Sequence, residues 1–312
     1  MNRARSVTIV EVGPRDGFQP IVPWIATEKK VRTISRLLDA GLRRIEITSF
    51  TSPKAIPQMR DAPEIVEACA RMGALSAQVL VPNTNYAHKA MEAGAKSLAY
   101  VFSVSEAHNL NNVKRTVEAS VNEFRELVKS SGSYFSRLNL STAFDCPFEG
   151  RIGPDAVLRV LDLIGEMPET CEICLCDTTG RATPDHVGSL FTLAMERFPS
   201  VNAWAFHGHD TYGLGAANCY AAYQSGVRVF DGAIGGLGGC PFAPGATGNA
   251  ATEDIVWMFE RMGIDTGTDL RKLVSVAEEV IRIPGAFNGG RVRQALTASC
   301  QGNTHSTGVD NV

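Results

Sequence analysis

Residues 202–234 read NAWAFHGHDTYGLGAANCYAAYQSGVRVFDGAI. The run Asn202–His207 predicts a strand, Gly215–Gly226 predicts a helix that ends at a glycine, and Val227–Ile234 predicts a second strand. Two strands joined through a helix form a βαβ unit, in which the strands run parallel. This stretch therefore predicts a parallel sheet covered by helices.

The same alternation extends over most of the chain. The other expected strands are Val7–Val12, Arg44–Ser49, Ala77–Val81, Ser97–Ser103, Ser136–Ala143 and Glu172–Asp177. The other expected helices are Thr27–Ala40, Ala62–Arg71, Asn85–Ala93, Val113–Ser130, Pro154–Glu166, Pro184–Arg197, Ala250–Met262 and a final one at Asp269–Ile283. Eight βα repeats predict an α/β fold of the TIM (β/α)8 barrel type, with an open doubly wound sheet as the alternative.

The domain organisation follows from the same pattern. We expect a barrel catalytic domain over residues 1–285 and a short C-terminal helical extension with a polar tail over residues 286–312. No low-complexity linker or sequence-level repeat divides the chain.

Composition excludes several partners. The net charge is −3, the pI is about 6.1, and lysines and arginines are dispersed, so we expect no nucleic-acid partner. No apolar run approaches the roughly 18 residues of a membrane span. Eight cysteines in a chain of this size, behind an N-terminus without a signal-like apolar segment, indicate a reduced, cytoplasmic protein. The composition is compatible with an anionic small molecule as the partner.

Chemically reactive residue types gather where a barrel enzyme carries its active site, at and after the carboxyl ends of the strands. Among them are Arg15, Asp16, Glu46, Ser49, Cys146, Glu149, Asp177, His207, His209, Cys240 and Asn249. We therefore expect one site at this end of the barrel.

His207 and His209 are two residues apart, so on an extended backbone both side chains point to the same side. Alone, this pair also fits two hydrogen-bonded structural histidines. With Asp16 and Asn249 converging on the same point, a six-coordinate divalent cation is the better interpretation. The oxygen ligands admit Mg²⁺, and the two histidine nitrogens shift the preference toward Mn²⁺ or Co²⁺. The set Cys171, Cys174 and Cys176 is expected in the core rather than on zinc.

The segment Gly235–Asn249 is rich in glycine and carries a single thiol, Cys240. Such a composition is typical of a loop that moves and lets backbone approach a ligand, although a tight structural turn with a buried cysteine is the alternative. Its position after the eighth strand favours a reactive cysteine.

Five motifs together resemble the 3-hydroxy-3-methylglutaryl-CoA lyase family, within a wider metallolyase superfamily. They are EVGPRDGFQ at 11–19, IEITSFTSPK at 45–54, CPFEG at 146–150, FHGHDTYG at 206–213 and the glycine-rich loop 235–249 followed by ATED at 251–254. The resemblance runs in order from residue 7 to about 265. The Gly-Gly-Cys-Pro segment resembles the lyase branch in particular.

The resemblance implies roles for individual residues. It implies cation ligands at Asp16, His207, His209 and Asn249. It implies catalytic roles for Arg15, facing the thioester oxygen, for Cys240, and for Glu46 in support of the site; His207 and Asp177 join the expected catalytic set. The expected substrate-binding residues are Arg15, Phe18, Gln19, Ser49 and Arg181. Phe18 and Arg181 depart from the family's usual Leu and apolar residues, so they bear on the acyl group.

The implied activity is a divalent-metal-dependent retro-Claisen cleavage of a tertiary 3-hydroxyacyl-CoA, with 3-hydroxy-3-methylglutaryl-CoA giving acetyl-CoA and acetoacetate. The alternatives are a lyase for a related acyl-CoA such as citramalyl-CoA, a Claisen-condensing synthase, and a non-catalytic metal-binding barrel. The expected cofactor is Mg²⁺ or Mn²⁺, the expected partner is a small acyl-CoA, and a homo-oligomer is expected.

Overall fold

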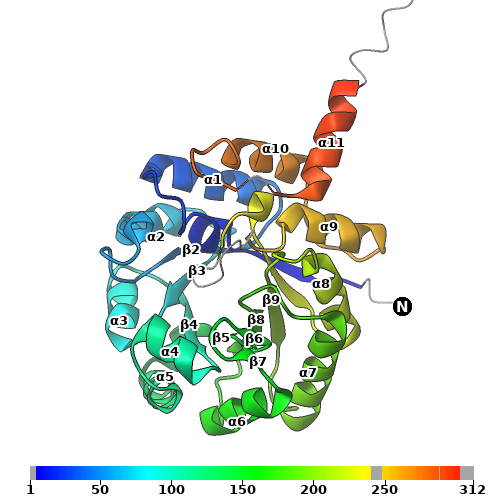
Figure 1. Ribbon diagram of the computed structural model, residues 1–312. Helices are drawn as coiled ribbons and strands as arrows, with labels where there is room; N and C mark the ends of the chain where they lie inside the picture. Colours follow the sequence, from blue (N-terminus) through cyan, green and yellow to red (C-terminus); the bar gives the residue numbers. More distant parts are fainter. Residues whose placement is uncertain (1–4, 240–247, 288, 303–312) are drawn as a thin grey trace, which may run out of the picture.

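A computed structural model describes residues 5–239, 248–287 and 289–302 (Figure 1). Eight strands close into a barrel in the order β1-β10-β9-β8-β5-β4-β3-β2, and every neighbouring pair is parallel. The strands are β1 Thr8–Glu11, β2 Arg44–Ser49, β3 Ser76–Val81, β4 Ser97–Ser103, β5 Phe135–Ser141, β8 Glu172–Asp177, β9 Trp204–Gly208 and β10 Val229–Gly232. A two-stranded antiparallel hairpin, β6 Asp145–Cys146 and β7 Gly150–Arg151, follows β5. The predicted TIM barrel is confirmed.

Helices surround the barrel on its outside (Figure 1). They are α1 Thr27–Asp39, α2 Ala62–Ala70, α3 Thr84–Glu92, α4 Glu106–Val113, α5 Val117–Ser131, α6 Pro154–Ile164, α7 Pro184–Arg197, α8 Gly215–Gln224, α9 Thr252–Arg261, α10 Leu270–Val280 and α11 Arg291–Gly302. Several begin as their sequences indicate, with proline in the first turn of α2, α6 and α7. The main hydrophobic core lies between these helices and the strands, where rings such as Phe144, Phe191 and Phe206 pack edge to face.

The helix predicted over 113–130 corresponds to α5, which begins at Val117, and a separate helix, α4, precedes it. Lys114 adopts a left-handed conformation (φ 60°) that ends α4 before α5 begins. Asn109 lies inside α4. Its amide oxygen accepts a hydrogen bond from the backbone N–H of Ser103 at 2.9 Å, which ties α4 to the end of β4.

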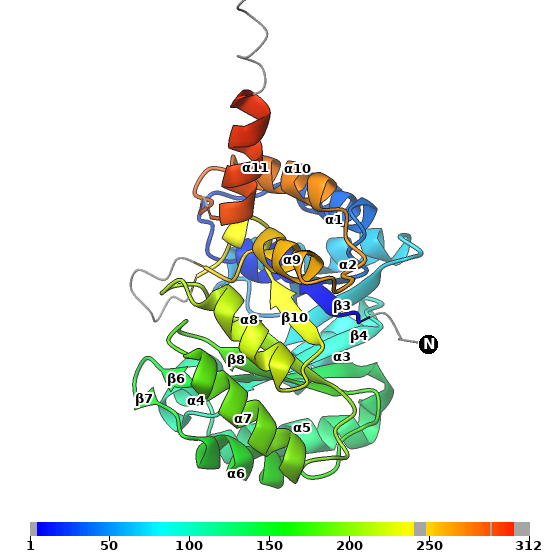
Figure 2. The ribbon, with the colours of Figure 1, turned by 90° about the vertical axis from the view of Figure 1, so that its right-hand side faces the viewer.

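The C-terminal helices attach to the barrel differently. Figures 1 and 2 show α10 beside α1 and α11 directed away from the barrel. The start of α11 is held by Asp254 of α9, whose carboxylate accepts hydrogen bonds from the backbone N–H groups of Arg291 (3.1 Å) and Val292 (2.7 Å). Among the described residues, no helix is long and apolar enough to cross a membrane.

Candidate active site

The turn after β1 places Arg15 and Asp16 at the mouth of the barrel. Residues Gly13–Gly17 form a single widened helical turn, and Glu11, the last residue of β1, anchors it. One carboxylate oxygen of Glu11 accepts from the backbone N–H groups of Gly13 (2.7 Å) and Ile234 (2.9 Å), and the other accepts from Thr252 Oγ1 at 2.6 Å. Glu11 therefore ties the first βα turn to the segment that follows β10. Burial raises the pKa of Glu11 to about 7.

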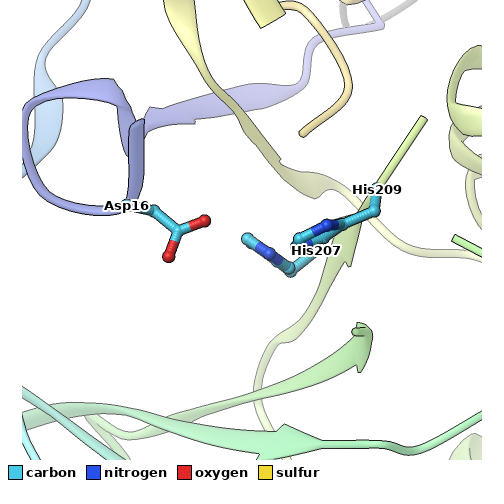
Figure 3. Close-up of side chains that lie close together, drawn as sticks. All are labelled: Asp16, His207 and His209. Atoms are coloured by element: carbon cyan, nitrogen blue, oxygen red, sulfur yellow. The ribbon is translucent and has the colours of Figure 1, made fainter. Parts of the chain in front are cut away.

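Asp16 faces the two histidines that end β9 (Figure 3). One ligand-type atom from each of Asp16, His207 and His209 lies within 4.8 Å of the others. Asn249 completes the group, because its amide nitrogen donates to Asp16 Oδ2 at 2.7 Å and to the carbonyl of Leu237 at 2.9 Å. The amide oxygen of Asn249 is buried and has no hydrogen-bond partner. A buried acceptor of this kind is costly unless it binds something, and oxygen and imidazole ligands at this spacing fit a divalent cation.

Electrostatics within this cluster are strongly coupled. Burial alone would raise the pKa of Asp16, but the charges of Arg15, His207 and His209 hold it below its ordinary value. Burial opposes protonation of His207, yet the bond to Asp231 and the neighbouring acidic groups raise its pKa to about 9. Burial and the charge of His207 lower the pKa of His209 to about 4. A cation at this point would replace the proton on His207.

Arg15 is buried between two carboxylates. Its guanidinium pairs with Glu46 of β2 and with the neighbouring Asp16. Glu46 also accepts a hydrogen bond from Gln78 Nε2 at 3.2 Å. These contacts fix the direction of the guanidinium and satisfy only part of its donor set, so Arg15 is positioned to bind an anionic oxygen beside Asp16.

Asp177 ends β8 next to Gly208 of β9. One of its carboxylate oxygens accepts from the backbone N–H of Ala182 at 3.2 Å, and the other is buried without a partner. Burial raises the pKa of Asp177 to about 7. A group with a pKa near neutrality is suited to proton transfer.

The expected substrate-binding residues occupy different environments. Ser49 is buried at the end of β2, and Gln19 is half-buried after the Arg15 turn. Phe18 has no exposed surface and belongs to the hydrophobic core, so in this conformation it offers a ligand no contact. Arg181 is half exposed, lies 3.4 Å from Asp145 and bonds the hydroxyl of Tyr212. Cys240 lies outside the described residues.

Sequence reasoning missed a set of charged residues inside the barrel. Asp231 of β10 lies beside His207, and its carboxylate is paired with the buried Arg137 of β5. Arg137 in turn contacts Glu172 of β8. A charged residue within an otherwise apolar strand was the available signal, because such residues are rarely buried without a partner.

A barrel that gathers two imidazoles, a carboxylate and an amide oxygen at the carboxyl ends of its strands belongs to the class of cation-binding TIM-barrel enzymes. The model of the HMGL-like family matches residues 6–280. The chain therefore belongs to this family, which confirms the resemblance seen in its motifs.

Individual relatives agree. Hydroxymethylglutaryl-CoA lyase YngG of Bacillus subtilis is 42% identical over 88% of this chain and 92% of its own length. The hydroxymethylglutaryl-CoA lyase of Pseudomonas mevalonii is 36% identical over 94% of this chain and 98% of its own. A crystal structure of the Bacillus subtilis HMG-CoA lyase superposes with a TM-score of 0.87 at 39% identity, covering 95% of this chain and 100% of that one.

A second solved relative contains ligands. The HMG-CoA lyase from Acinetobacter baumannii, in complex with coenzyme A and 3-methylmalate, has a TM-score of 0.87 and 36% identity, covering 100% of this chain and 99% of that one. The carboxyl transferase domain of Rhizobium etli pyruvate carboxylase, at 17% identity and a TM-score of 0.64, shares the fold alone. By its family the protein is a carbon–carbon lyase.

Proposed function

We propose that this protein cleaves 3-hydroxy-3-methylglutaryl-CoA to acetyl-CoA and acetoacetate with the help of a divalent cation. The observation that carries the proposal is the convergence of Asp16, His207 and His209 directly beside Arg15. Asn249 is hydrogen-bonded to Asp16, and its amide oxygen is buried without a partner. The relatives named hydroxymethylglutaryl-CoA lyase support the substrate.

The four residues Asp16, His207, His209 and Asn249 would hold the cation. Two nitrogens and two oxygens suit Mg²⁺ or Mn²⁺ and leave coordination positions for substrate oxygens. When bound, the cation supplies Lewis-acid polarisation of the substrate's hydroxyl and carboxylate oxygens.

The reaction removes the proton of the tertiary hydroxyl, breaks the bond between C2 and C3, and leaves the electron pair on the thioester as an enolate. Arg15 would face the thioester oxygen and stabilise its negative charge, with Glu46 holding the guanidinium in place. Asp177, with its pKa of about 7, is the candidate for taking up the hydroxyl proton, while His207, whose Nδ1 faces Asp231, serves as a ligand. Protonation of the enolate carbon gives acetyl-CoA, and we assign this step to Cys240.

The surroundings of the acyl group are a separate matter. We assign Gln19, Ser49 and Arg181 to the substrate pocket, whereas Phe18 is fully buried and would act on its shape only through the core. The half-exposed Arg181 favours a second candidate, a related acyl-CoA with a differently placed carboxylate such as citramalyl-CoA. The structure from Acinetobacter baumannii contains coenzyme A, which supports an acyl-CoA in either case.

We further propose a cytoplasmic homo-oligomer whose catalytic unit spans residues 1–285, with residues 286–312 as an extension. Neither nucleic acid nor membrane is part of the proposal.

The direct test measures the release of acetyl-CoA from 3-hydroxy-3-methylglutaryl-CoA in the presence of Mg²⁺ or Mn²⁺. A second assay measures the consumption of acetyl-CoA in the presence of 2-oxo acids. We expect the wild type to release acetyl-CoA and the Asp16→Asn variant to release none. Consumption of acetyl-CoA without cleavage would instead identify a Claisen-condensing synthase. The absence of both reactions, with every acyl-CoA offered, would overturn the assignment of an acyl-CoA enzyme.

A further inference from the structure

A row of charged side chains crosses the inside of the barrel and ends at His207. Arg44 of β2 binds Glu172 of β8 through two hydrogen bonds of 2.7 and 3.1 Å. Glu172 accepts from Arg137 Nε at 2.5 Å, and Arg137 Nη1 donates to both oxygens of Asp231, at 2.7 and 2.8 Å. The strands β2, β8, β5 and β10 thus supply alternating charges in a line.

The last contact of this row reaches the cation site. Oδ2 of Asp231 lies 3.1 Å from Nδ1 of His207, and the two residues are register partners on β10 and β9. Because a carboxylate only accepts hydrogen bonds, this contact requires the hydrogen of the imidazole on Nδ1. Nε2 then carries the free lone pair, and Figure 3 shows the far end of the ring directed toward Asp16.

Burial makes this arrangement rigid. Arg137 has no exposed surface and Asp231 is 3% exposed. Nη1 of Arg137 contacts both oxygens of Asp231 while its Nε contacts Glu172, so one planar guanidinium holds two carboxylates in a fixed relation, which a single ammonium group does less well. Barrel interiors are usually filled by layers of branched apolar residues, so an ionic row at this place is an exception that calls for a function.

We propose that Asp231 is a positioning residue that selects the imidazole tautomer and orientation with which His207 binds the divalent cation, and that Arg137 holds Asp231 in place. The inference rests on the proposed cation site. Neither residue touches the reacting atoms, and both act through His207.

Asp231→Asn is the sharpest variant, because asparagine keeps the shape of aspartate. If its oxygen faces His207, its amide group faces the positively charged Arg137. If its amide group faces His207, the hydrogen of the imidazole moves to Nε2 and the ligand lone pair is lost. Either arrangement disfavours cation binding, and loss of such supporting contacts commonly lowers metal affinity by about 10- to 100-fold.

The experiment measures Mn²⁺ binding by titration calorimetry on the full-length protein, without substrate. We expect the Kd of Asp231→Asn to rise by about 10- to 100-fold. Arg137→Lys retains the charge but cannot contact Glu172 and Asp231 through two separate nitrogens, so its Kd should rise by a smaller factor. The Co²⁺ absorption spectrum of both variants should also differ from that of the wild type, since it reports ligand geometry.

The matched control is Asp61→Asn. Asp61 is likewise a buried carboxylate, and it is paired with the buried side chain of Lys30 at 2.9 Å. This ion pair does not belong to the row of charged residues that ends at His207. This variant should lose stability and keep the wild-type Kd for Mn²⁺. Should Asp231→Asn not fold, Arg137→Lys carries the test with the same control.

A wild-type Mn²⁺ affinity and Co²⁺ spectrum in the folded Asp231→Asn or, failing that, Arg137→Lys protein would overturn the positioning role and leave the proposed function intact. A wild-type protein that binds no Mn²⁺ would overturn the cation site itself, and with it this inference.

Discussion

Asn249 donates a hydrogen bond from its side-chain amide to the carboxylate of Asp16 over 2.7 Å, across a sequence separation of 233 residues. The contact joins the turn after β1 to the segment after β10. It also orients the amide, because the nitrogen is used by Asp16 and Leu237 and the oxygen is left without a partner. The bond therefore leaves a buried acceptor unpaired on a side chain that contacts Asp16.

Metal removal provides the first prediction. Chelation should abolish lyase activity, and Mg²⁺ or Mn²⁺ should restore it, because the polarising group is lost and returned. Asn249→Ala should weaken Mn²⁺ binding by roughly tenfold or more, in line with the loss of a ligand-orienting contact, while His209→Ala should abolish metal retention. Calorimetry measures Mn²⁺ binding by the two variants, and activity assays before and after chelation measure the dependence on the cation. A fully active metal-free preparation would contradict the assignment.

The second prediction concerns Cys240. Serine keeps the size of the side chain but is a much weaker acid, so Cys240→Ser should lower kcat by about two to four orders of magnitude with little change in substrate binding. Steady-state kinetics with 3-hydroxy-3-methylglutaryl-CoA measures this. Cys69→Ser serves as the control, because this thiol is buried in α2. Normal turnover by Cys240→Ser would move the proton step to another residue.

Substrate choice is tested at Arg181. Its contact with Asp145 is long and half exposed, so the guanidinium is free to turn toward a substrate carboxylate at little cost in stability. If it does so, Arg181→Val should change the ratio of kcat/KM between 3-hydroxy-3-methylglutaryl-CoA and citramalyl-CoA by about tenfold or more, as the loss of a charged hydrogen bond predicts.

The control for this prediction is Arg197→Val, which removes an exposed arginine from the end of α7. The ratio of kcat/KM should not change in that variant. If 3-hydroxy-3-methylglutaryl-CoA is the best substrate and Arg181→Val leaves the ranking unchanged, Arg181 is a surface charge without a part in specificity.

The fourth prediction is a pH dependence of stability that originates at Glu253. Its carboxylate accepts from the backbone N–H of Gly235 at 3.1 Å, its other oxygen is buried without a partner, and burial raises its pKa from 4.5 to about 8. A carboxyl group whose pKa is higher in the folded state stabilises the protein fully below about pH 4.5, and this contribution is lost as the pH rises through about 8.

Glu253→Gln remains neutral at every pH and lacks this loss. Relative to the wild type, its free energy of unfolding should therefore be higher at pH 8.5 than at pH 5.5 by about 1–3 kcal/mol, since one pKa unit corresponds to about 1.4 kcal/mol. Urea unfolding at the two pH values measures the difference. Glu67→Gln, at an exposed position of α2, should show no such change, and an equal pH slope in wild type and Glu253→Gln would refute the role of this carboxyl group.

Local patterns determined much of this protein. The bounds of β2, β4, β8 and α7 agree with the sequence prediction, because short apolar runs, turn glycines and helix-initiating prolines act within a few residues. The placement of Asp16, His207 and His209 followed from the same reasoning, since the ends of parallel strands in a barrel meet at one face.

The tertiary structure alone decided what lies behind that face. Glu11 contacts residues 223 and 241 positions away, and Arg137 reaches across the barrel to Asp231. The register of all eight strands decides which side chains meet inside the closed barrel. The periodicity of one strand does not reveal which residues of the other strands its side chains will contact. The sequence alone could thus propose the cation ligands, but the residues that contact them from behind became visible only once the barrel was closed.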